Sequence, residues 1–223
     1  MKIEILTLFP EMFEALRASI IGRATSSGKL DIKIINIRDF SEDKHKKCDD
    51  TPFGGGAGMV MTPQPLASAL KSIRGYKSAR KIFMSPSGER LNQQMVTNLA
   101  TEKHLIIVCG HYEGIDQRII DLFNLEEISI GDYVLTGGEI PAMALVDSVS
   151  RYIGGVLGNN ESLTEESFSS GMLEYPQYTK PREFMGVAVP EVLTSGDHKK
   201  IAEWRKARAL EKTTRVRPDL LNK

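Results

Sequence analysis

The sequence predicts an α/β protein with a parallel central sheet covered by helices on both faces. Five short runs rich in Ile and Val alternate along the chain with segments whose apolar residues recur at helical spacing. The runs are almost continuously apolar, as expected for parallel strands that are buried on both sides. At 223 residues the chain is long enough for one large domain and a small second one.

The predicted strands cover residues 3–8, 32–37, 81–84, 105–109 and 128–130. Residues 10–22, 63–73, 92–103, 115–123 and 139–152 have the spacing of helices. Pro10 and Pro63 suit the first turn of a helix, where the missing N–H has no partner to lose, and Gly22 and Gly28 suit a helix exit. The strand and helix alternation therefore continues to about residue 152.

The pattern changes after residue 153. Residues 154–171 contain four glycines and indicate an interdomain linker that we expect to become ordered on binding. Residues 175–181 are too proline-rich for a helix, and Asp197 is a candidate N-cap for a helix that ends near Lys212. We therefore expect an α/β domain at 1–153, a linker at 154–171 and a small helical domain at 172–223.

The charges of the chain cancel overall but not locally. There are 29 basic and 29 acidic residues in total. From Lys199 onward there are nine Lys or Arg against three Asp or Glu, so the C-terminus is basic and the remainder is net acidic. This asymmetry favours a nucleic-acid contact at the C-terminus. In the last predicted helix, Ile201, Trp204 and Leu210 indicate an apolar face, and the cations Lys200, Arg205 and Arg208 are candidates for RNA phosphates.

The sequence gives no sign of metal binding, secretion or membrane insertion. Cys48 and Cys109 are far apart, and the four histidines have no metal-ligand spacing. No secretory signal pattern occupies residues 1–10, and no apolar stretch approaches 18 residues. We therefore expect reduced thiols and a cytoplasmic protein with no membrane partner.

Two glycine-rich stretches are the strongest functional signals. They are Gly110-His-Tyr-Glu-Gly-Ile-Asp116 and Ile130-Gly-Asp-Tyr-Val-Leu-Thr-Gly-Gly-Glu139, and each follows a predicted strand. Glycines let a backbone approach a ligand closely, whereas Tyr112, Glu113 and Tyr133 offer ring faces and a carboxylate that favour a cation. S-adenosylmethionine fits this description, because it joins an adenosine to a sulfonium and carries no phosphate.

A third segment, Asp49-Asp-Thr-Pro-Phe-Gly-Gly-Gly-Ala-Gly-Met59, has four glycines in five positions. It matches neither the dinucleotide-binding pattern nor the P-loop, which ends in Gly-Lys-Ser or Gly-Lys-Thr. This disfavours an NAD enzyme and an NTPase. A flexible surface loop remains an alternative explanation of the composition.

Several of these motifs, in this order, resemble the bacterial tRNA (guanine-N1-)-methyltransferase family, TrmD. The resemblance extends from near residue 1 to the end of the chain. It is carried by Asn36-Ile-Arg-Asp-Phe40, by the 49–59 segment, by Cys109-Gly-His-Tyr-Glu-Gly-Ile-Asp116, by Ser129-Ile-Gly-Asp-Tyr-Val-Leu135, by Asp147-Ser-Val-Ser-Arg151 and by Thr194-Ser-Gly-Asp-His198. Several long motifs in one order are far more specific than any one of them.

The resemblance implies a trefoil-knotted cofactor site of the SPOUT class and a homodimer with the active site between subunits. Periodicity alone would have predicted an ordinary doubly wound sheet, because knots are rare. In the family, the cofactor S-adenosylmethionine lies among three loops. These loops correspond here to Met84, Ser85 and Pro86, to Gly110, Tyr112 and Glu113, and to Ile130, Gly131, Asp132, Tyr133, Val134, Leu135, Gly137 and Gly138.

The implied reaction is methyl transfer to N1 of guanine 37 in the anticodon loop of tRNA. Because guanine N1 carries a proton at neutral pH, a general base is needed, and a cation is effective where negative charge develops on O6. The family's supporting arginine corresponds to Arg151. Its catalytic aspartate falls on Glu166, a departure that adds one methylene. Glu165 is the competing base.

Each candidate also has a structural explanation. Residues 162–165 read as a capping box, in which both glutamates only favour a helix N-terminus. Tyr112 and Tyr133 could be core aromatics, Glu113 and Asp116 solvated acids at a helix start, and Arg151 a partner of a helix dipole. Two alternative functions remain: a related knotted methyltransferase acting on another RNA position, and an RNA-binding homologue with weakened catalysis.

Overall fold

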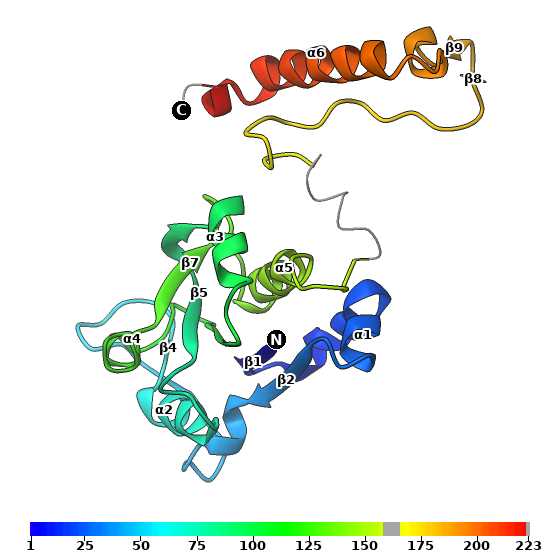
Figure 1. Cartoon of the computed structure of the whole chain (residues 1–223). Helices are drawn as coiled ribbons and strands as arrows, with labels where there is room; N and C mark the ends of the chain where they lie inside the picture. The colour runs from blue at the N-terminus through cyan, green and yellow to red at the C-terminus, as the bar shows by residue number, and fades with distance from the viewer. Residues whose placement is uncertain (158–165, 222–223) are drawn as a thin grey trace. The chain divides into compact units, whose positions relative to one another are not determined.

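A computed structural model describes residues 1–157 and 166–221 of the chain (Figure 1). The chain forms two compact units, Met1–Gly158 and Asn159–Lys223. Residues 158–165 of the predicted linker, 154–171, lie outside the described residues. They include Glu165 and the predicted capping box at 162–165.

The first unit is built on a five-stranded parallel sheet, which confirms the predicted sheet. Its strands are β1 (Lys2–Thr7), β2 (Asp31–Asn36), β5 (Arg80–Arg90), β6 (His104–Cys109) and β7 (Glu126–Ser129). Their order in the sheet is β2-β1-β6-β5-β7, and all four neighbouring pairs are parallel. A separate antiparallel pair joins β3 (Asp49–Asp50) to β4 (Val60–Met61).

Helices cover both faces of this sheet (Figure 1). They are α1 (Ser19–Ser26), α2 (Pro63–Ser72), α3 (Gln93–Leu99), α4 (Gln117–Phe123) and α5 (Glu139–Ser150), with 3₁₀ helices η1 (Pro10–Arg17) and η2 (Ile37–Phe40). Because successive strand residues point to opposite faces, Ile107 of β6 packs with α1, α3 and α5, and Ile106 packs with α2 and α4. Apolar burial on both faces holds the sheet in place.

The predicted helix over residues 10–22 is wrong in two respects. It divides into η1 and α1, and Ser19 takes a positive φ of 55° at the junction. Gly22 lies inside α1 instead of at an exit. A glycine is required there, because a Cβ would lie only 2.0 Å from the carbonyl oxygen of Arg17. Gly28, with φ of 73°, follows α1 as predicted.

Strand β5 is longer than predicted. It pairs with β7 through Met84, shifts register, and pairs again at Glu89 and Arg90. The residues between, which include Pro86 and Gly88, form a bulge in β5, because Met84 and Glu89 both pair with Ile128. This irregularity contributes to the site described below.

The second unit contains one long helix. Its elements are β8 (Glu183–Phe184), β9 (Val187–Ala188), η4 (Glu191–Thr194), α6 (His198–Val216) and η5 (Pro218–Leu221). Asp197 is the N-cap of α6 and accepts from the Lys200 N–H, as predicted. The prediction that Leu210 is part of the apolar face is wrong, because Leu210 is 47% exposed and the buried positions are Ala209 and Thr213.

Both cysteines are free and buried. Within the described part of the chain, the helices are all too short or too polar to span a bilayer.

Candidate functional site

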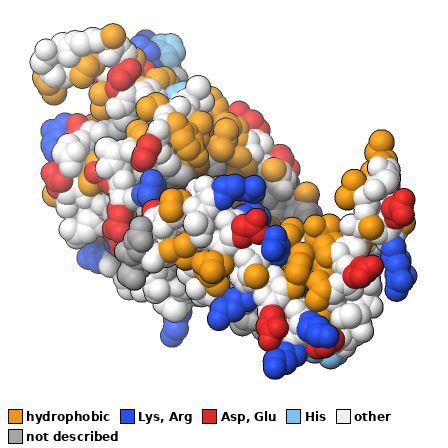
Figure 2. Space-filling view, turned by 90° about the horizontal axis from the view of Figure 1, so that it is seen from above, with side chains coloured by type: hydrophobic (Ala, Val, Ile, Leu, Met, Phe, Trp, Pro, Cys, Tyr) orange, Lys and Arg blue, Asp and Glu red, His pale blue; other side chains and the backbone are white. Residues whose placement is uncertain are grey.

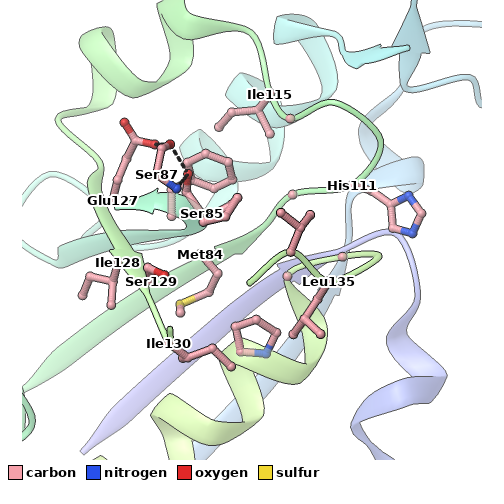
Figure 3. Close-up of a pocket in the computed structure, with 18 of the residues that line it drawn as sticks. Met84, Ser85, Ser87, His111, Ile115, Glu127, Ile128, Ser129, Ile130 and Leu135 are labelled. Atoms are coloured by element: carbon pink, nitrogen blue, oxygen red, sulfur yellow. Dashed lines mark hydrogen bonds between the residues drawn. The ribbon is translucent and has the colours of Figure 1, made fainter. Parts of the chain in front are cut away.

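A cavity of about 350 Å³ opens at the carboxyl ends of the strands β5, β6 and β7 (Figure 3). We call it the strand-end pocket. It is lined by the end of β5 from Phe83 to Ser87, by the loop after β6, and by the chain from Glu127 to Gly138. Figure 3 shows Met84, Ile130 and Leu135 facing one space from three different segments. Ligand sites in parallel α/β sheets lie at this edge, so it is the first place to seek chemistry.

The structure brings the predicted cofactor-binding residues together around this pocket, with the exception of Asp132. The lining includes Met84, Ser85, Pro86, Gly110, Tyr112, Glu113, Ile130, Gly131, Tyr133, Val134, Leu135, Gly137 and Gly138. Asp132 is absent from the lining, and its side chain is 86% exposed and pairs with Arg90 at 3.4 Å. The sequence stretches coincide with the wall of one pocket because each follows the end of a neighbouring strand.

Two glycines let the pocket loops pack against each other. A Cβ on Gly138 would lie 2.8 Å from the Cα of Cys109 and 2.9 Å from the backbone nitrogen of Gly110. The Gly138 N–H donates to the Gly110 carbonyl at 2.8 Å. A Cβ on Gly110 would meet the Phe83 ring at 2.7 Å. No larger residue fits at either position without movement of the wall.

The two tyrosines of the pocket are not core aromatics. Tyr112 is 42% exposed and has a positive φ of 60°, and Tyr133 is 55% exposed. The Tyr133 ring lies over Gly131, where a Cβ would be only 2.5 Å from a ring carbon. The structure thus excludes the core explanation and leaves both rings at the pocket wall, where they can contact a ligand.

The pocket carries negative charge. Glu113 and Glu127 line it, and no Lys or Arg occurs among the described residues of its wall. The Ser87 hydroxyl donates to Glu127 at 3.3 Å and hydrogen-bonds with Ser85 at 2.8 Å (Figure 3). A wall of this kind favours a cationic ligand over a phosphorylated one.

Asp116 is confirmed as an acid at a helix start. It is the N-cap of α4 and accepts from the Arg118 backbone N–H at 2.9 Å. Hydrogen bonds from the Arg118 guanidinium hold the pKa of Asp116 below its usual value. The side chain therefore serves the fold, whereas Glu113, three residues earlier, faces the pocket.

A buried carboxylate lies beneath the pocket. Glu139, the first residue of α5, is 2% exposed and accepts from the Thr7 hydroxyl at 2.7 Å. Burial, assisted by Glu139, raises the pKa of the neighbouring Cys109 thiol well above its usual range. Cys109 therefore stays protonated and does not serve as a nucleophile.

The glycine-rich segment 49–59 is anchored to the pocket wall at its C-terminal end. Met59 accepts from the Glu113 N–H at 2.9 Å, and a Cβ on Gly58 would meet the Glu113 side chain at 2.4 Å. Phe53 is fully exposed, and Gly54 to Gly56 have positive φ. The segment is a surface loop, as composition suggested, with one end held against the pocket.

The two predicted catalytic residues belong to different units. Arg151 is the C-cap of α5 in the first unit, and its N–H donates to the Asp147 carbonyl at 3.3 Å. Glu166 belongs to the second unit and is half-buried, and its carbonyl accepts from the Ser169 N–H at 3.2 Å.

Sequence reasoning missed part of the pocket wall. The unexpected polar residues are Ser87, Gln117, Glu127 and Ser129. Ser87 reaches the wall through the irregular end of β5, and Glu127 and Ser129 reach it because β7 pairs with β5. Neither the strand order nor the register shift has a local sequence signal. His111, though quoted within a motif, was also not assigned a role, and it lines the pocket beside the Phe9 ring.

Comparisons with known proteins identify the family. Residues 1–223 match the family described as tRNA (Guanine-1)-methyltransferase TrmD. The chain is 57% identical to a protein of Alkaliphilus oremlandii, covering 99% of this chain and 92% of that protein. It is 55% identical to one of Clostridium perfringens strain SM101, covering 100% and 94%, and 54% identical to one of Moorella thermoacetica, covering 99% and 90%. All three relatives are named tRNA (guanine-N(1)-)-methyltransferase. With a family match over its whole length and relatives more than 50% identical across nearly the whole chain, this chain belongs to the TrmD family.

Proposed function

We propose that this protein transfers a methyl group from S-adenosylmethionine to N1 of guanine 37 in the anticodon loop of tRNA. The observation that carries the proposal is the coincidence of two findings at one place. Two of the motifs that the chain shares with the family, residues 109–116 and 129–135, contribute to the wall of the strand-end pocket, and that wall has the chemistry of a sulfonium nucleoside site.

The strand-end pocket fits S-adenosylmethionine in shape and charge. Gly110 and Gly138 let the two loops of the wall pack closely, and the exposed rings of Tyr112 and Tyr133 offer faces to a flat purine. Met84, Ile130 and Leu135 supply apolar contact, and Glu113 and Glu127 suit the sulfonium and ammonium charges. When bound, S-adenosylmethionine supplies an electrophilic methyl group.

The remaining chemistry is proton removal and charge stabilisation. In this proposal Glu166 accepts the N1 proton of guanine, which frees the lone pair that attacks the methyl carbon. Negative charge then moves toward O6, and the guanidinium of Arg151 stabilises it there. Glu differs from the family's Asp by one methylene, so the backbone of this chain must compensate, since a displacement of about 1 Å can cost on the order of 100-fold in rate.

The wider architecture of the proposal follows the family. The chain threads through a trefoil knot to form the cofactor site, and two copies form a homodimer with the active site between subunits. Residues 1–153 act as the cofactor domain, 154–171 as the linker and 172–223 as the tRNA-contacting domain, in which Lys200, Arg205 and Arg208 meet phosphates. The protein acts in the cytoplasm.

A transfer assay tests this function. Purified protein is incubated with methyl-labelled S-adenosylmethionine and a tRNA transcript, and the modified nucleoside is mapped by mass spectrometry. We expect one 1-methylguanosine at position 37 and no label after guanine 37 is replaced. Label retained in the substituted transcript would assign the protein to another RNA position, and cofactor and RNA binding without label transfer would indicate a homologue with weakened catalysis.

A further inference from the structure

A second cavity lies wholly within the second unit. Its volume is about 410 Å³. The wall comes from residues 175–182, from Val189 and the η4 region, and from the first turns of α6. We call it the tail pocket. One residue of the family motifs quoted above, Thr194, lines it, but none of the predicted catalytic or cofactor residues does.

The tail pocket is positively charged. Lys180, Arg182 and Arg205 line it, and the described residues of its wall include no Asp or Glu. Lys180 and Arg182 are exposed, whereas Arg205 is half-buried with its guanidinium 4.8 Å from the centre of the Tyr175 ring. Such stacking holds a guanidinium in a fixed place. Three cations around one concave surface select an anionic ligand.

The same cavity offers aromatic and apolar surface. Tyr178 is 47% exposed, and its ring centre lies 6.3 Å from that of Trp204, the only tryptophan of the chain. Val189, Leu193 and Ile201 are half-buried and also line the wall. Hydrophobic side chains also adjoin Lys and Arg side chains elsewhere on the face of the molecule drawn in Figure 2. The tail pocket has both kinds within one cavity. A ligand with both a charged group and a flat apolar face suits this combination.

A nucleotide of a folded RNA has both features, provided that its base is unstacked. Bases inside a helix cover one another's faces, whereas bases in loops and bulges are free to stack on protein aromatics. A free phosphate would satisfy the cations but not the aromatic wall, and an apolar peptide would satisfy the wall but not the cations.

We propose that the tail pocket takes one unstacked nucleotide of the RNA substrate, distinct from the target guanine. Its base stacks on Tyr178, and its phosphate lies near Lys180 and Arg182. This inference rests on the proposed function, because that function supplies the RNA. It adds a second point at which the enzyme recognises its RNA.

The stacking contact is tested by the affinity of the full-length protein for an unmodified tRNA transcript. We expect Tyr178→Ala to weaken binding roughly five- to 150-fold, the value of one base–aromatic stack, with the salt dependence unchanged. Tyr178→Phe retains the ring and should bind within about twofold of the wild type. The matched control is Phe184→Ala, since Phe184 is 66% exposed in the same unit and does not line the pocket.

The phosphate contact has a different signature. Lys180→Gln should weaken RNA binding and lower the slope of log affinity against log salt by about 0.7 to 0.9, the release expected from one phosphate. Lys77→Gln removes the same charge from an exposed position just before the amino end of β5 and should change neither quantity.

Three results would overturn the inference. The first is an unchanged tRNA affinity for both Tyr178→Ala and Lys180→Gln, with Trp204 fluorescence showing a folded second unit. The second is a loss of self-association in sedimentation without a loss of RNA affinity, which would assign the tail pocket to a protein partner. The third is ultraviolet crosslinking of Tyr178 to guanine 37. Failure of the proposed function differs from all three, because the wild-type protein would then not methylate the transcript.

Discussion

The strand-end pocket and the tail pocket have walls of opposite charge. Glu113 and Glu127 line the strand-end pocket, whereas Lys180, Arg182 and Arg205 line the tail pocket, and neither wall has a residue of the other sign among its described members, apart from His111 in the first. The chain as a whole is neutral. The separation therefore arises from where the charges lie, and it matches two ligands: a cationic methyl donor and a polyanionic RNA.

Neither pocket contains the predicted general base. In our proposals the strand-end pocket binds the methyl donor and the tail pocket binds RNA, but proton removal is assigned to Glu166, which lines neither pocket. The variants below test this division of roles, beginning with the largest expected effect.

Glu166→Gln should abolish turnover while cofactor binding remains. A neutral amide cannot accept the N1 proton, and loss of a general base typically costs roughly 100- to 10,000-fold. The measurements are kcat with a tRNA transcript and the Kd for S-adenosylmethionine. Glu165→Gln is the matched control, and the two glutamates exchange roles if that variant is inactive and Glu166→Gln is active.

Arg151→Gln should lower kcat roughly 100-fold, because one preorganised cation opposite a developing charge is removed. The Kd for S-adenosylmethionine should stay near that of the wild type, since Arg151 does not line the strand-end pocket. Single-turnover kinetics separates the chemical step from binding. A variant with normal kcat and weaker cofactor binding would contradict the assigned role.

Gly138→Ala should destabilise the first unit by about 1 to 3 kcal/mol and weaken cofactor binding, because the added methyl meets the backbone of Cys109 and Gly110. Urea unfolding measures the stability. Gly154→Ala is the control, since a Cβ there has no atom within 4 Å and its φ is not in the left-handed region. Equal stability of the two variants would show that the strand-end wall is not tightly packed.

Much of the fold was predictable, and the reasons for the failures are local. Ile82, Ile107 and their neighbours form apolar runs, so the strands and their burial were evident from sequence. Ser19 has no sequence feature that announces its positive φ, so the break between η1 and α1 was missed. Gly22 was predicted to end a helix, but a glycine is required there because a side chain would collide with the backbone of Arg17. That contact depends on how η1 and α1 meet, which the sequence does not indicate.

The wall residues that belong to motifs after strand ends were predictable. The wall residues that depend on which strands are neighbours in the sheet were not. Gly110 and Gly138 were found because glycines stand out in sequence. Glu127 is in the wall because β7 lies beside β5 in the sheet, although α3, β6 and α4 come between these two strands along the chain. For the tail pocket, the only feature visible in the sequence was the basic C-terminus. Lys180 and Arg205 are 25 positions apart, and only the fold of the second unit brings them into one wall.

Glu113→Gln should reduce the preference for a charged methyl donor. We expect the ratio of Kd values for S-adenosylhomocysteine and S-adenosylmethionine to fall about two- to fivefold, a modest change because Glu113 is exposed. Calorimetry measures both constants. Asp132→Asn changes a carboxylate outside the lining and should leave the ratio unaltered, and a larger effect from Asp132 would restore the assignment implied by family resemblance.

Asp116→Asn should have the smallest effect, below about 1 kcal/mol at pH 7, because Asn retains the N-cap and only an exposed ion pair is lost. Since the pKa of Asp116 is lowered in the folded protein, its charge stabilises the fold above the unfolded pKa of about 3.9, and this contribution disappears as pH falls through the folded pKa. The difference in unfolding free energy between wild type and variant should therefore shrink in acid. A difference that grows in acid would contradict the assignment.

The most direct measurement is a calorimetric titration of the wild-type protein with S-adenosylmethionine and, separately, with ATP. Both ligands carry adenosine, but one is a cation and the other a polyanion. The acidic wall of the strand-end pocket predicts saturable binding of S-adenosylmethionine, weakened in Gly138→Ala, and no detectable competition by ATP. Tight ATP binding to the folded protein, with no heat from S-adenosylmethionine, would contradict the account.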